Sequence, residues 1–434
     1  MLQRLIVSKV MVAEKDVDSM YKKWRIKILI GMYVGYTAYY FTRKSLNFIA
    51  PNLLAEHLLT KEMLGIMSTL FYIVYGLSKF FSGILSDKSN PRWFMGGGLI
   101  VTGIINILFG FSSSTALFIT LWIINAYFQG WGWAPCSKLL TSWYSKSERG
   151  TWWSIQNTSH NVGGALIPIV VGIITLHYGW RFGMMIPGII AIACGLFVCW
   201  RLRDKPETMG LPTVGHWRND QLELQQEAAS VKADTKTIII NYILKNKAIW
   251  LLSLTYVMVY VVRTSINDWS NIYLTEARGF NILTANSTIS YFEIGGFLGS
   301  LFAGWGSDFF FKGRRAPINI IFAIGVVVAL FLLWKLNTAS YLVFSCIYFM
   351  TGFFIFGPQM LIGIMAAEAS HKDAAGAAVG FVSLFGYVGA ALSGYPVAKA
   401  IEAYQWHGFF TIILGTSILA ALCLVPFIFS KNKV

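Results

Sequence analysis

Charged side chains are scarce in this 434-residue sequence: Asp, Glu, Lys and Arg make up 13% of it, against 56% apolar residues. Soluble domains usually carry about a quarter of charged residues. The apolar residues are grouped in runs long enough to cross a bilayer, which takes about 20 residues each. The shortage of charge therefore argues against a water-soluble protein and predicts an integral membrane protein.

Several motifs of soluble enzymes are also missing. No G-x-x-x-x-G-K-[ST] phosphate loop occurs, so the sequence offers no basis for ATP hydrolysis. The five cysteines lie in or beside apolar runs, without the paired spacing of a metal site or a disulfide framework. No Ser–His–Asp elbow is assembled, and the first 23 residues lack the pattern of a removable signal peptide. We therefore expect no enzyme, no metal site and no cofactor.

Twelve apolar runs follow one another along the chain. They lie near residues 26–43, 63–85, 93–113, 116–138, 151–174, 181–200, 248–272, 284–306, 316–335, 340–364, 374–397 and 407–429. In hydrocarbon, each backbone polar group must be satisfied within its own segment, so runs of this length are expected to be helices. The predicted fold class is an all-α membrane protein with twelve transmembrane helices.

The sequence is strongly basic, with 35 Lys and Arg against 20 Asp and Glu. Most of the basic residues fall in the N-terminal tail, in alternate short loops, in the polar stretch 201–247 and at the C-terminus. The positive-inside rule assigns these parts, including both termini, to the cytoplasm. Because the basic residues are spread over loops and are not gathered on one face, nucleic acid is not expected as a partner.

The chain contains an internal repeat. Tyr36-x3-Tyr40-x2-Arg43-x-Ser45-Leu46-Asn47 recurs as Tyr256-x3-Tyr260-x2-Arg263-x-Ser265-Ile266-Asn267, and Gly83-x3-Asp87 recurs as Gly304-x3-Asp308. The polar stretch separates six runs from six, which gives both halves the same orientation and makes this a parallel repeat. We expect an N-terminal six-helix bundle at 1–200, a cytoplasmic central loop at 201–247 and a C-terminal six-helix bundle at 248–434.

Arg43 and Arg263 occupy matching points of the first run in each half. Arginine near the middle of a bilayer costs about 3 kcal/mol on insertion scales and remains charged, so it needs an aqueous cavity or a partner. The alternatives are an ion pair with Glu293 or Asp268, or snorkelling to the interface. Symmetry weakens both alternatives, because no duplicated carboxylate accompanies the two arginines. Guanidinium groups bind phosphate bidentately, which favours an anion as their shared partner. We therefore predict a shared anion site.

Tyrosines precede both arginines on the same helical face. Tyr36 and Tyr40 lie before Arg43, and Tyr260 lies before Arg263, at spacings of three or seven residues. Their hydroxyls could donate to a phosphate or orient an arginine, whereas the alternative is the aromatic belt of a membrane interface. We assign all three to the predicted site.

Three further polar residues lie within apolar runs. Lys79 follows Tyr75 by one turn on one face of the second run, where it requires an anion or an acidic partner. His160 shares a face of the fifth run with Asn157 and Asn161. A lone histidine can be a satisfied core residue, but an imidazole that titrates near neutrality could bind phosphate or couple protonation to binding. We assign Lys79, Tyr75, His160 and Asn157 to the site.

Charged turns between the runs are expected to hold helix ends in one conformation, not to touch substrate. The residues assigned to this role are Asp87, Arg92, Arg149, Asp308, Arg314 and Glu368.

These residues resemble the major facilitator superfamily and, within it, the organophosphate–phosphate antiporters, over essentially the whole chain. Tyr36-x3-Tyr40-Phe41-x-Arg43-Lys44 is similar to that family's first-helix signature. Lys79, His160 and Arg263 fall where the bacterial glycerol-3-phosphate carriers place their phosphate-binding lysine, histidine and second arginine. Gly357-Pro358-Gln359-Met360 and Asp268-Trp269 resemble the hexose-phosphate branch, but the Asp–Lys pair of that branch's eleventh helix is missing across Phe381–Val397.

The resemblance implies a monomeric secondary transporter of a bacterial inner membrane. It would exchange a sugar phosphate, with glucose 6-phosphate as the expected sugar, for inorganic phosphate by alternating access. The alternative is a membrane receptor for external glucose 6-phosphate that signals to a sensor kinase. The sequence names no residue that separates the two.

Overall fold

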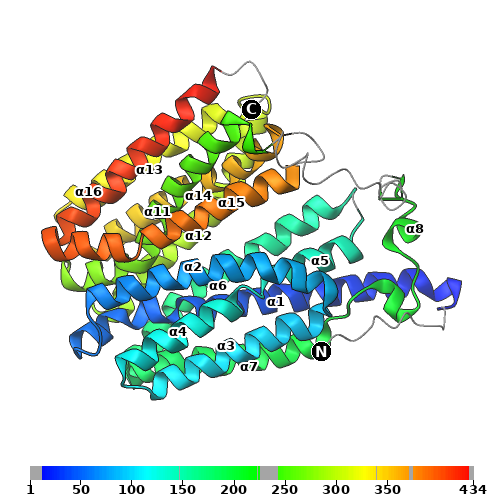
Figure 1. Ribbon diagram of the computed structural model, residues 1–434, viewed down its shortest axis with the longest axis horizontal. Helices are drawn as coiled ribbons and strands as arrows, with labels where there is room; N and C mark the ends of the chain where they lie inside the picture. The colour runs from blue at the N-terminus through cyan, green and yellow to red at the C-terminus, as the bar shows by residue number, and fades with distance from the viewer. Residues whose placement is uncertain are drawn as a thin grey trace. The chain divides into compact units, whose positions relative to one another are not determined.

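The computed structural model describes residues 12–145, 147–221, 223–224, 243–338, 340–370 and 375–429, and the side chains of residues 84, 87, 88, 375 and 376 lie outside that description. Every regular element in this part of the chain is a helix (Figure 1). The helices are α1 (Glu14–Ala55), α2 (Lys61–Lys88), α3 (Pro91–Phe111), α4 (Thr115–Gln129), α5 (Trp133–Trp143), α6 (Arg149–Tyr178), α7 (Trp180–Arg201), the 3-10 helix η1 (Pro206–Met209), α8 (Val214–Arg218), α11 (Lys247–Glu276), α12 (Ile282–Phe309), α13 (Arg315–Lys335), α14 (Tyr341–Glu368), α15 (Ala375–Leu392) and α16 (Tyr395–Ile428).

Helices long and apolar enough to span a membrane account for eight segments of the described chain. The last of these, Ala377–Ile428, covers both α15 and α16. Each of the twelve predicted runs overlaps at least one helix, so the expectation of helices throughout is confirmed. The bounds of the last two predicted runs, 374–397 and 407–429, differ from those of the helices. Helix α16 already begins at Tyr395, and it bends at Gln405, where φ is 54° and ψ is −152°.

The fourth predicted run, 116–138, is not one helix. Helix α4 ends at Gln129 and α5 begins at Trp133. Gly130 lies at this break, where a Cβ atom would come within 2.9 Å of the backbone nitrogen of Lys79 on α2. Ser82 of α2 donates a hydrogen bond of 2.7 Å to the Gly130 carbonyl, and Ser78 donates to the Tyr127 carbonyl. Hydroxyls of α2 thus satisfy the carbonyls that the break releases, which is the condition for interrupting a helix at membrane depth.

Backbone contacts divide the chain into two compact units, each described here by itself. Unit 1 comprises residues 1–45, 74–167 and 181–231, and unit 2 comprises residues 46–73, 168–180 and 232–434. Helices α1, α2 and α6 each contribute residues to both units. The predicted division at the central loop, into 1–200 and 248–434, stays a prediction.

Small residues set the helix packing inside each unit. In unit 1, a Cβ atom on Gly103 of α3 would lie 2.5 Å from the Gly188 carbonyl oxygen of α7. In unit 2, Gly299 of α12 faces the Phe353 backbone of α14, and Gly352 of α14 faces the Phe292 backbone of α12, with no room for a side chain in either case. Close backbone approach through small residues is typical of helices packed in membranes. Lipid chains are as apolar as the helix surface, so burial of apolar surface alone does little to drive helices together.

Candidate functional site

Arg43 of α1 lies in unit 1 with its guanidinium group in contact with two other helices. Its Nε donates a hydrogen bond of 3.1 Å to Oε1 of Gln129, the last residue of α4. Its guanidinium carbon lies 4.6 Å from the ring centroid of Tyr40 and 4.6 Å from that of Tyr75 on α2. The two rings attract the cation through their faces, and the glutamine fixes one edge of the guanidinium plane.

Gln129 is itself held by hydrogen bonds. Its Nε2 donates to the Thr42 hydroxyl at 2.8 Å and to Oδ1 of Asn125 at 3.4 Å. Asn125 in turn donates to the Thr42 carbonyl at 2.9 Å, and both amide side chains are buried. With its NH₂ group engaged in this way, the glutamine must present its oxygen to Arg43. Sequence reasoning did not assign Gln129 to the site, although two amides one turn apart in an apolar run were a signal for it.

Aromatic rings extend the cluster from Arg43 to α6. The ring centroids of Tyr36 and Tyr40 are 5.9 Å apart, and those of Tyr40 and His160 are 6.0 Å apart. Tyr36 also packs against Trp133 of α5 at 5.1 Å. The structure therefore brings together Tyr36, Tyr40, Tyr75 and His160 beside Arg43, and adds Trp133, which the sequence analysis had not assigned.

His160 forms a hydrogen bond between its Nδ1 and the Asn157 carbonyl oxygen. A carbonyl can only accept, so this hydrogen bond places a proton on Nδ1. Asn157 thus contributes its backbone to the histidine, while its own side chain is exposed. Lys79 is half-buried on α2, one turn after Tyr75, at the level of the α4–α5 break.

Arg263 of α11 lies in unit 2 and has aromatic neighbours. Its guanidinium carbon is 4.5 Å from the ring centroid of Phe356 on α14 and 5.7 Å from that of Tyr260. Tyr260 packs against Tyr256 at 4.8 Å and against Tyr387 of α15 at 6.2 Å. The duplicated tyrosine–arginine pair is therefore repeated in the structure of each unit, and a phenylalanine stands beside Arg263. Phe356 and Tyr387 had not been assigned to the site.

Asp268, one of the two carboxylates considered as an arginine partner, accepts hydrogen bonds from three neutral side chains of unit 2. Asn47 donates to its Oδ1 at 2.7 Å, Ser68 to its Oδ2 at 2.6 Å, and Tyr72 to its Oδ1 at 3.2 Å. The carboxylate is buried, with 9% of its surface exposed. These donors lie on α1 and α2, so Asp268 joins those helices to α11.

Charged residues in unit 1 attach the segment after α7 to the ends of other helices. Arg149 forms an ion pair of 2.8 Å with Glu223, and Glu148 forms pairs with Arg25 at 2.7 Å and with Arg218 at 2.8 Å. The Arg149 side chain also donates to the Tyr144 and Thr141 carbonyls. The positional role expected for Arg149 stays a prediction.

The corresponding turn of unit 2 is held by Arg315. Its Nη1 lies 2.6 Å from Oδ1 of Asp308, and its Nε lies 3.3 Å from Oε1 of Glu368. Arg314 donates at 2.8 Å to the Ile428 carbonyl at the end of α16. Arg92 donates to the Cys199 carbonyl in unit 1, and the predicted role of the Asp87 side chain lies outside the described residues.

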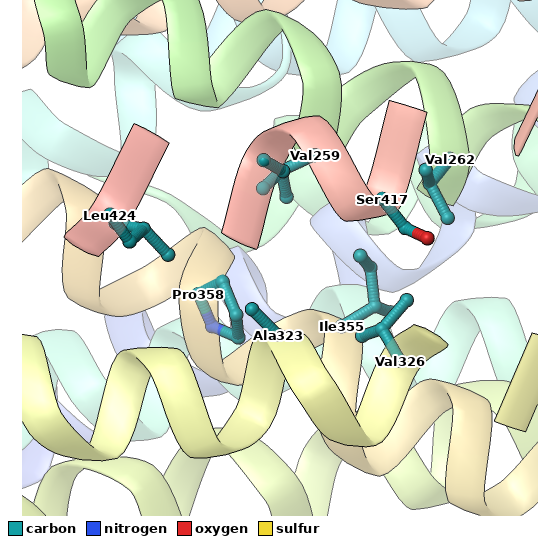
Figure 2. Close-up of a pocket in the computed structure, with 9 residues that line it drawn as sticks. Val259, Val262, Ala323, Val326, Ile355, Pro358, Ser417 and Leu424 are labelled. Carbon is teal, nitrogen blue, oxygen red and sulfur yellow. The ribbon is translucent and has the colours of Figure 1, made fainter. Parts of the chain in front are cut away.

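A small cavity in unit 2 lies apart from these clusters. Helices α11, α13, α14 and α16 enclose it, and Figure 2 shows aliphatic side chains such as Val259, Val326 and Leu424 around it, with Ser417 the polar side chain of its lining. Its volume of about 10 Å³ is about that of one water probe. Such a space reflects imperfect packing and is too small and too apolar for a phosphorylated ligand.

An all-α chain of long apolar helices, with charged and aromatic groups gathered inside each unit, defines a membrane transport fold. Residues 32–394 match the Major Facilitator Superfamily, and the chain belongs to this family. The predicted fold class, an all-α membrane protein of the major facilitator fold, is confirmed. A solved bacterial homolog of the human lysosomal transporter Spinster, in an inward-facing and unoccupied conformation, superposes with a TM-score of 0.73 at 14% identity, covering 94% of this chain and 99% of that one.

The curated relatives are more specific. The chain is 55% identical to the membrane sensor protein UhpC of Salmonella typhimurium over 95% of its own length and 93% of that protein. It is 48% identical to a probable hexose phosphate transport protein of Chlamydia trachomatis, over 94% and 92% of the two chains. It is 37% identical to the glycerol-3-phosphate transporter of Bacillus subtilis, over 95% and 94%. The resemblance drawn from the sequence motifs is thereby confirmed.

Proposed function

We propose that this protein is a secondary transporter that exchanges a sugar phosphate, glucose 6-phosphate in the first instance, for inorganic phosphate. The observation that carries this proposal is the repeated arrangement of a membrane-embedded arginine against tyrosine, at Arg43 with Tyr40 and at Arg263 with Tyr260. A guanidinium group offers parallel N–H donors that match two phosphoryl oxygens, and low polarity around it strengthens the attraction. The sugar is inferred from the relatives named for hexose phosphate and glycerol 3-phosphate transport.

Each arginine has a defined task in this proposal. Gln129, Tyr40 and Tyr75 hold Arg43 in one orientation before the ligand arrives, so that less side-chain entropy is lost on binding. Phe356 and Tyr260 do the same for Arg263. The His160 imidazole binds the phosphate or couples protonation to binding, and Lys79 adds positive charge. Tyr36, Tyr40 and Tyr260 supply hydroxyls.

The cycle we propose is alternating access in a bacterial inner membrane, with both termini in the cytoplasm and the protein acting as a monomer. The two halves rock about a fixed site that opens to each side in turn. A cationic arginine site that holds no anion is costly in a low-dielectric environment, so the empty state is a poor one for the transition. Exchange of one phosphate for another follows from this electrostatic cost.

The test is exchange of labelled phosphate for glucose 6-phosphate in proteoliposomes. We expect Arg43→Lys and Arg263→Lys to lower exchange roughly tenfold or more, because an ammonium group cannot replace a charge-assisted bidentate contact. Arg278→Lys is the matched control, since Arg278 lies 5.3 Å from the Tyr273 and Phe344 ring centroids, outside the site. Near-normal exchange in either site variant would refute the arginine assignment.

A second candidate function is favoured by one observation: the relatives at 55% and 54% identity are named membrane sensor proteins. In that case the same site would bind external glucose 6-phosphate and signal to a membrane sensor kinase. Binding of the sugar phosphate to purified protein that shows no exchange would support the receptor and reject the transporter. Exchange at a rate proportional to occupancy would support the transporter.

A further inference from the structure

Four cationic side chains from α1, the start of α3 and the end of α7 gather in unit 1. Lys27 lies in α1, Arg92 in the first turn of α3, Arg201 at the end of α7, and Arg203 two residues later. The charges of Arg201 and Arg203 act on Lys27, and the charge of Arg92 acts on Arg203. Burial and then the neighbouring Arg92 lower the pKa of Arg203 from its ordinary value. The cluster is therefore both partly desolvated and self-repelling.

Tryptophan rings lie against all four cations. Lys27 Nζ is 4.6 Å from the Trp24 ring centroid, and the Arg203 guanidinium carbon is 5.2 Å from the same ring. Arg92 lies 4.6 Å from Trp93, and Arg201 lies 5.2 Å from Trp200. Tryptophan is enriched where a membrane meets water, because its ring is apolar and its N–H is polar.

Within the described residues, no carboxylate forms an ion pair with any of these four cations. Three carboxylates of the same unit are paired elsewhere. Asp18 pairs with Lys22 at 2.7 Å, and Glu148 pairs with Arg25 and Arg218. Asp204, whose side chain is 1% exposed, lies 3.1 Å from Lys138.

Arg201 also has a buried nitrogen atom without a hydrogen-bond acceptor among the described residues. Its Nε is buried and has no hydrogen-bond partner in the part of the chain that the structure describes. Its stem is held in place, because the Cγ of Arg201 lies 3.4 Å from the position of a Cβ on Gly31 of α1. A buried guanidinium N–H without an acceptor costs free energy.

The surface beside the cations is apolar and exposed. Ile26 and Ile30 flank Lys27 on α1 with 57% and 43% of their surface exposed, and Trp93 follows Arg92 with 54% exposed. Leu196 and Trp200, on the last turns of α7, are 59% and 61% exposed. A ligand that matches this surface has an anionic head and long hydrocarbon chains.

We propose that this cluster is a binding site for the phosphate of an anionic phospholipid, with Lys27 and Arg201 as its principal contacts and Arg92 and Arg203 adding charge. The acyl chains lie along Ile26, Ile30 and Leu196, and the three tryptophans mark the level of the headgroup. Basic pockets between transmembrane helices on the cytoplasmic side are the usual location of such sites. The lipid neutralises cations on three helices at once and so stabilises their packing. This site is separate from the proposed substrate site and does not depend on the transport activity.

Native mass spectrometry of the full-length protein tests the proposal, with phosphatidylglycerol and phosphatidylcholine of identical acyl chains as probes. We expect the wild type to retain phosphatidylglycerol in preference to phosphatidylcholine. The variant Lys27→Gln/Arg201→Gln should weaken phosphatidylglycerol binding roughly thirtyfold, at about fivefold for each cation removed. The charge-preserving variant Lys27→Arg/Arg201→Lys should retain most of the preference for phosphatidylglycerol. Its comparison with the double glutamine variant shows whether the loss of binding is due to the loss of charge.

Lys335→Gln is the matched control, because Lys335 lies 4.2 Å from the Trp334 ring centroid on α13 of unit 2, a lysine–tryptophan pair like Lys27 with Trp24. It should leave lipid retention unchanged. Equal retention of the two lipids by the wild type, or retention within twofold of wild type in the double glutamine variant, would overturn the proposal. Displacement of the lipid by millimolar inorganic phosphate would also overturn it, in favour of a site for free phosphate.

Discussion

The guanidinium carbon of Arg43 lies 4.6 Å from the ring centroid of Tyr75, and the two residues belong to different helices, α1 and α2. The Tyr40 ring lies at the same distance, so the cation contacts aromatic rings on its own helix and on a neighbouring one. These contacts prevent Arg43 from folding back along α1 and hold its guanidinium group in one orientation. In the proposed site the tyrosines therefore act through the arginine as well as through their hydroxyls.

Substitution of Tyr75 separates these two effects. Tyr75→Phe keeps the ring face and should weaken glucose 6-phosphate binding about twofold, whereas Tyr75→Leu removes the ring and should weaken it about tenfold, the range of a desolvated cation–π contact. Isothermal titration of the purified protein measures both. Equal losses in the two variants would show that the hydroxyl, not the ring, matters.

Gln129 offers a second test of how Arg43 is held. Gln129→Glu places a carboxylate where the amide oxygen now accepts from Arg43 at 3.1 Å, so the arginine gains a permanent anion that competes with phosphate. We expect this variant to bind inorganic phosphate at least tenfold more weakly, and Gln129→Leu, which only removes the acceptor, to lose less. Competition with labelled phosphate gives the comparison, and a Gln129→Glu protein with wild-type affinity would contradict it.

The Asp268 cluster should contribute to stability. Ser68→Ala removes a hydrogen bond of 2.6 Å to a buried carboxylate, which costs roughly 1.5–3 kcal/mol in unfolding free energy. Ser287→Ala is the control, because Ser287 donates only along its own helix, to the Thr284 carbonyl. Reversible denaturation in mixed micelles measures the unfolding free energy of both variants. Equal losses in the two variants would contradict a special stabilising role for Asp268.

The segment after α7 should detach as the pH falls. Burial raises the pKa of Glu148, but the hydrogen bonds from Arg218 and Arg25 outweigh this and bring the pKa below its ordinary value. A carboxyl group whose pKa is lowered on folding stabilises the folded state above its ordinary pKa of about 4.3, and this contribution is lost as the pH falls toward and through the lowered value. Hydrogen bonds from Ser147 likewise lower the pKa of Asp220.

Trp217 reports this detachment, because its ring stacks on Tyr21 at 4.3 Å and lies 5.2 Å from the guanidinium carbon of Arg25. We expect the Trp217 fluorescence, taken as the difference between the wild type and Trp217→Phe, to change between pH 6 and pH 3.5. In Glu148→Gln the segment should be detached in part already at pH 7, and the fluorescence should change less on acidification. Protonation of Asp220 should account for the change that remains. An unchanged pH response in Glu148→Gln would rule out this ion pair as the cause.

What the sequence determined by itself was local or periodic. Apolar runs of bilayer length predicted helices wherever the structure describes them, and the spacing of Tyr40 to Arg43 and of Tyr260 to Arg263 placed each tyrosine beside its arginine, since residues three apart on a helix are neighbours. The repeat predicted that both halves would contain this pair.

Tertiary structure alone decided which other helices meet those residues. Tyr75, Gln129 and Phe356 reach the arginines from α2, α4 and α14. Of the two adjacent arginines before and at the start of α13, Arg315 reaches Asp308 and Arg314 reaches the end of α16. The break between α4 and α5 depends likewise on hydroxyls of α2 that lie far away in the sequence. Periodicity assigns a residue to a face of its own helix, but the partner of that face is set by how whole helices pack, and no local pattern encodes that packing.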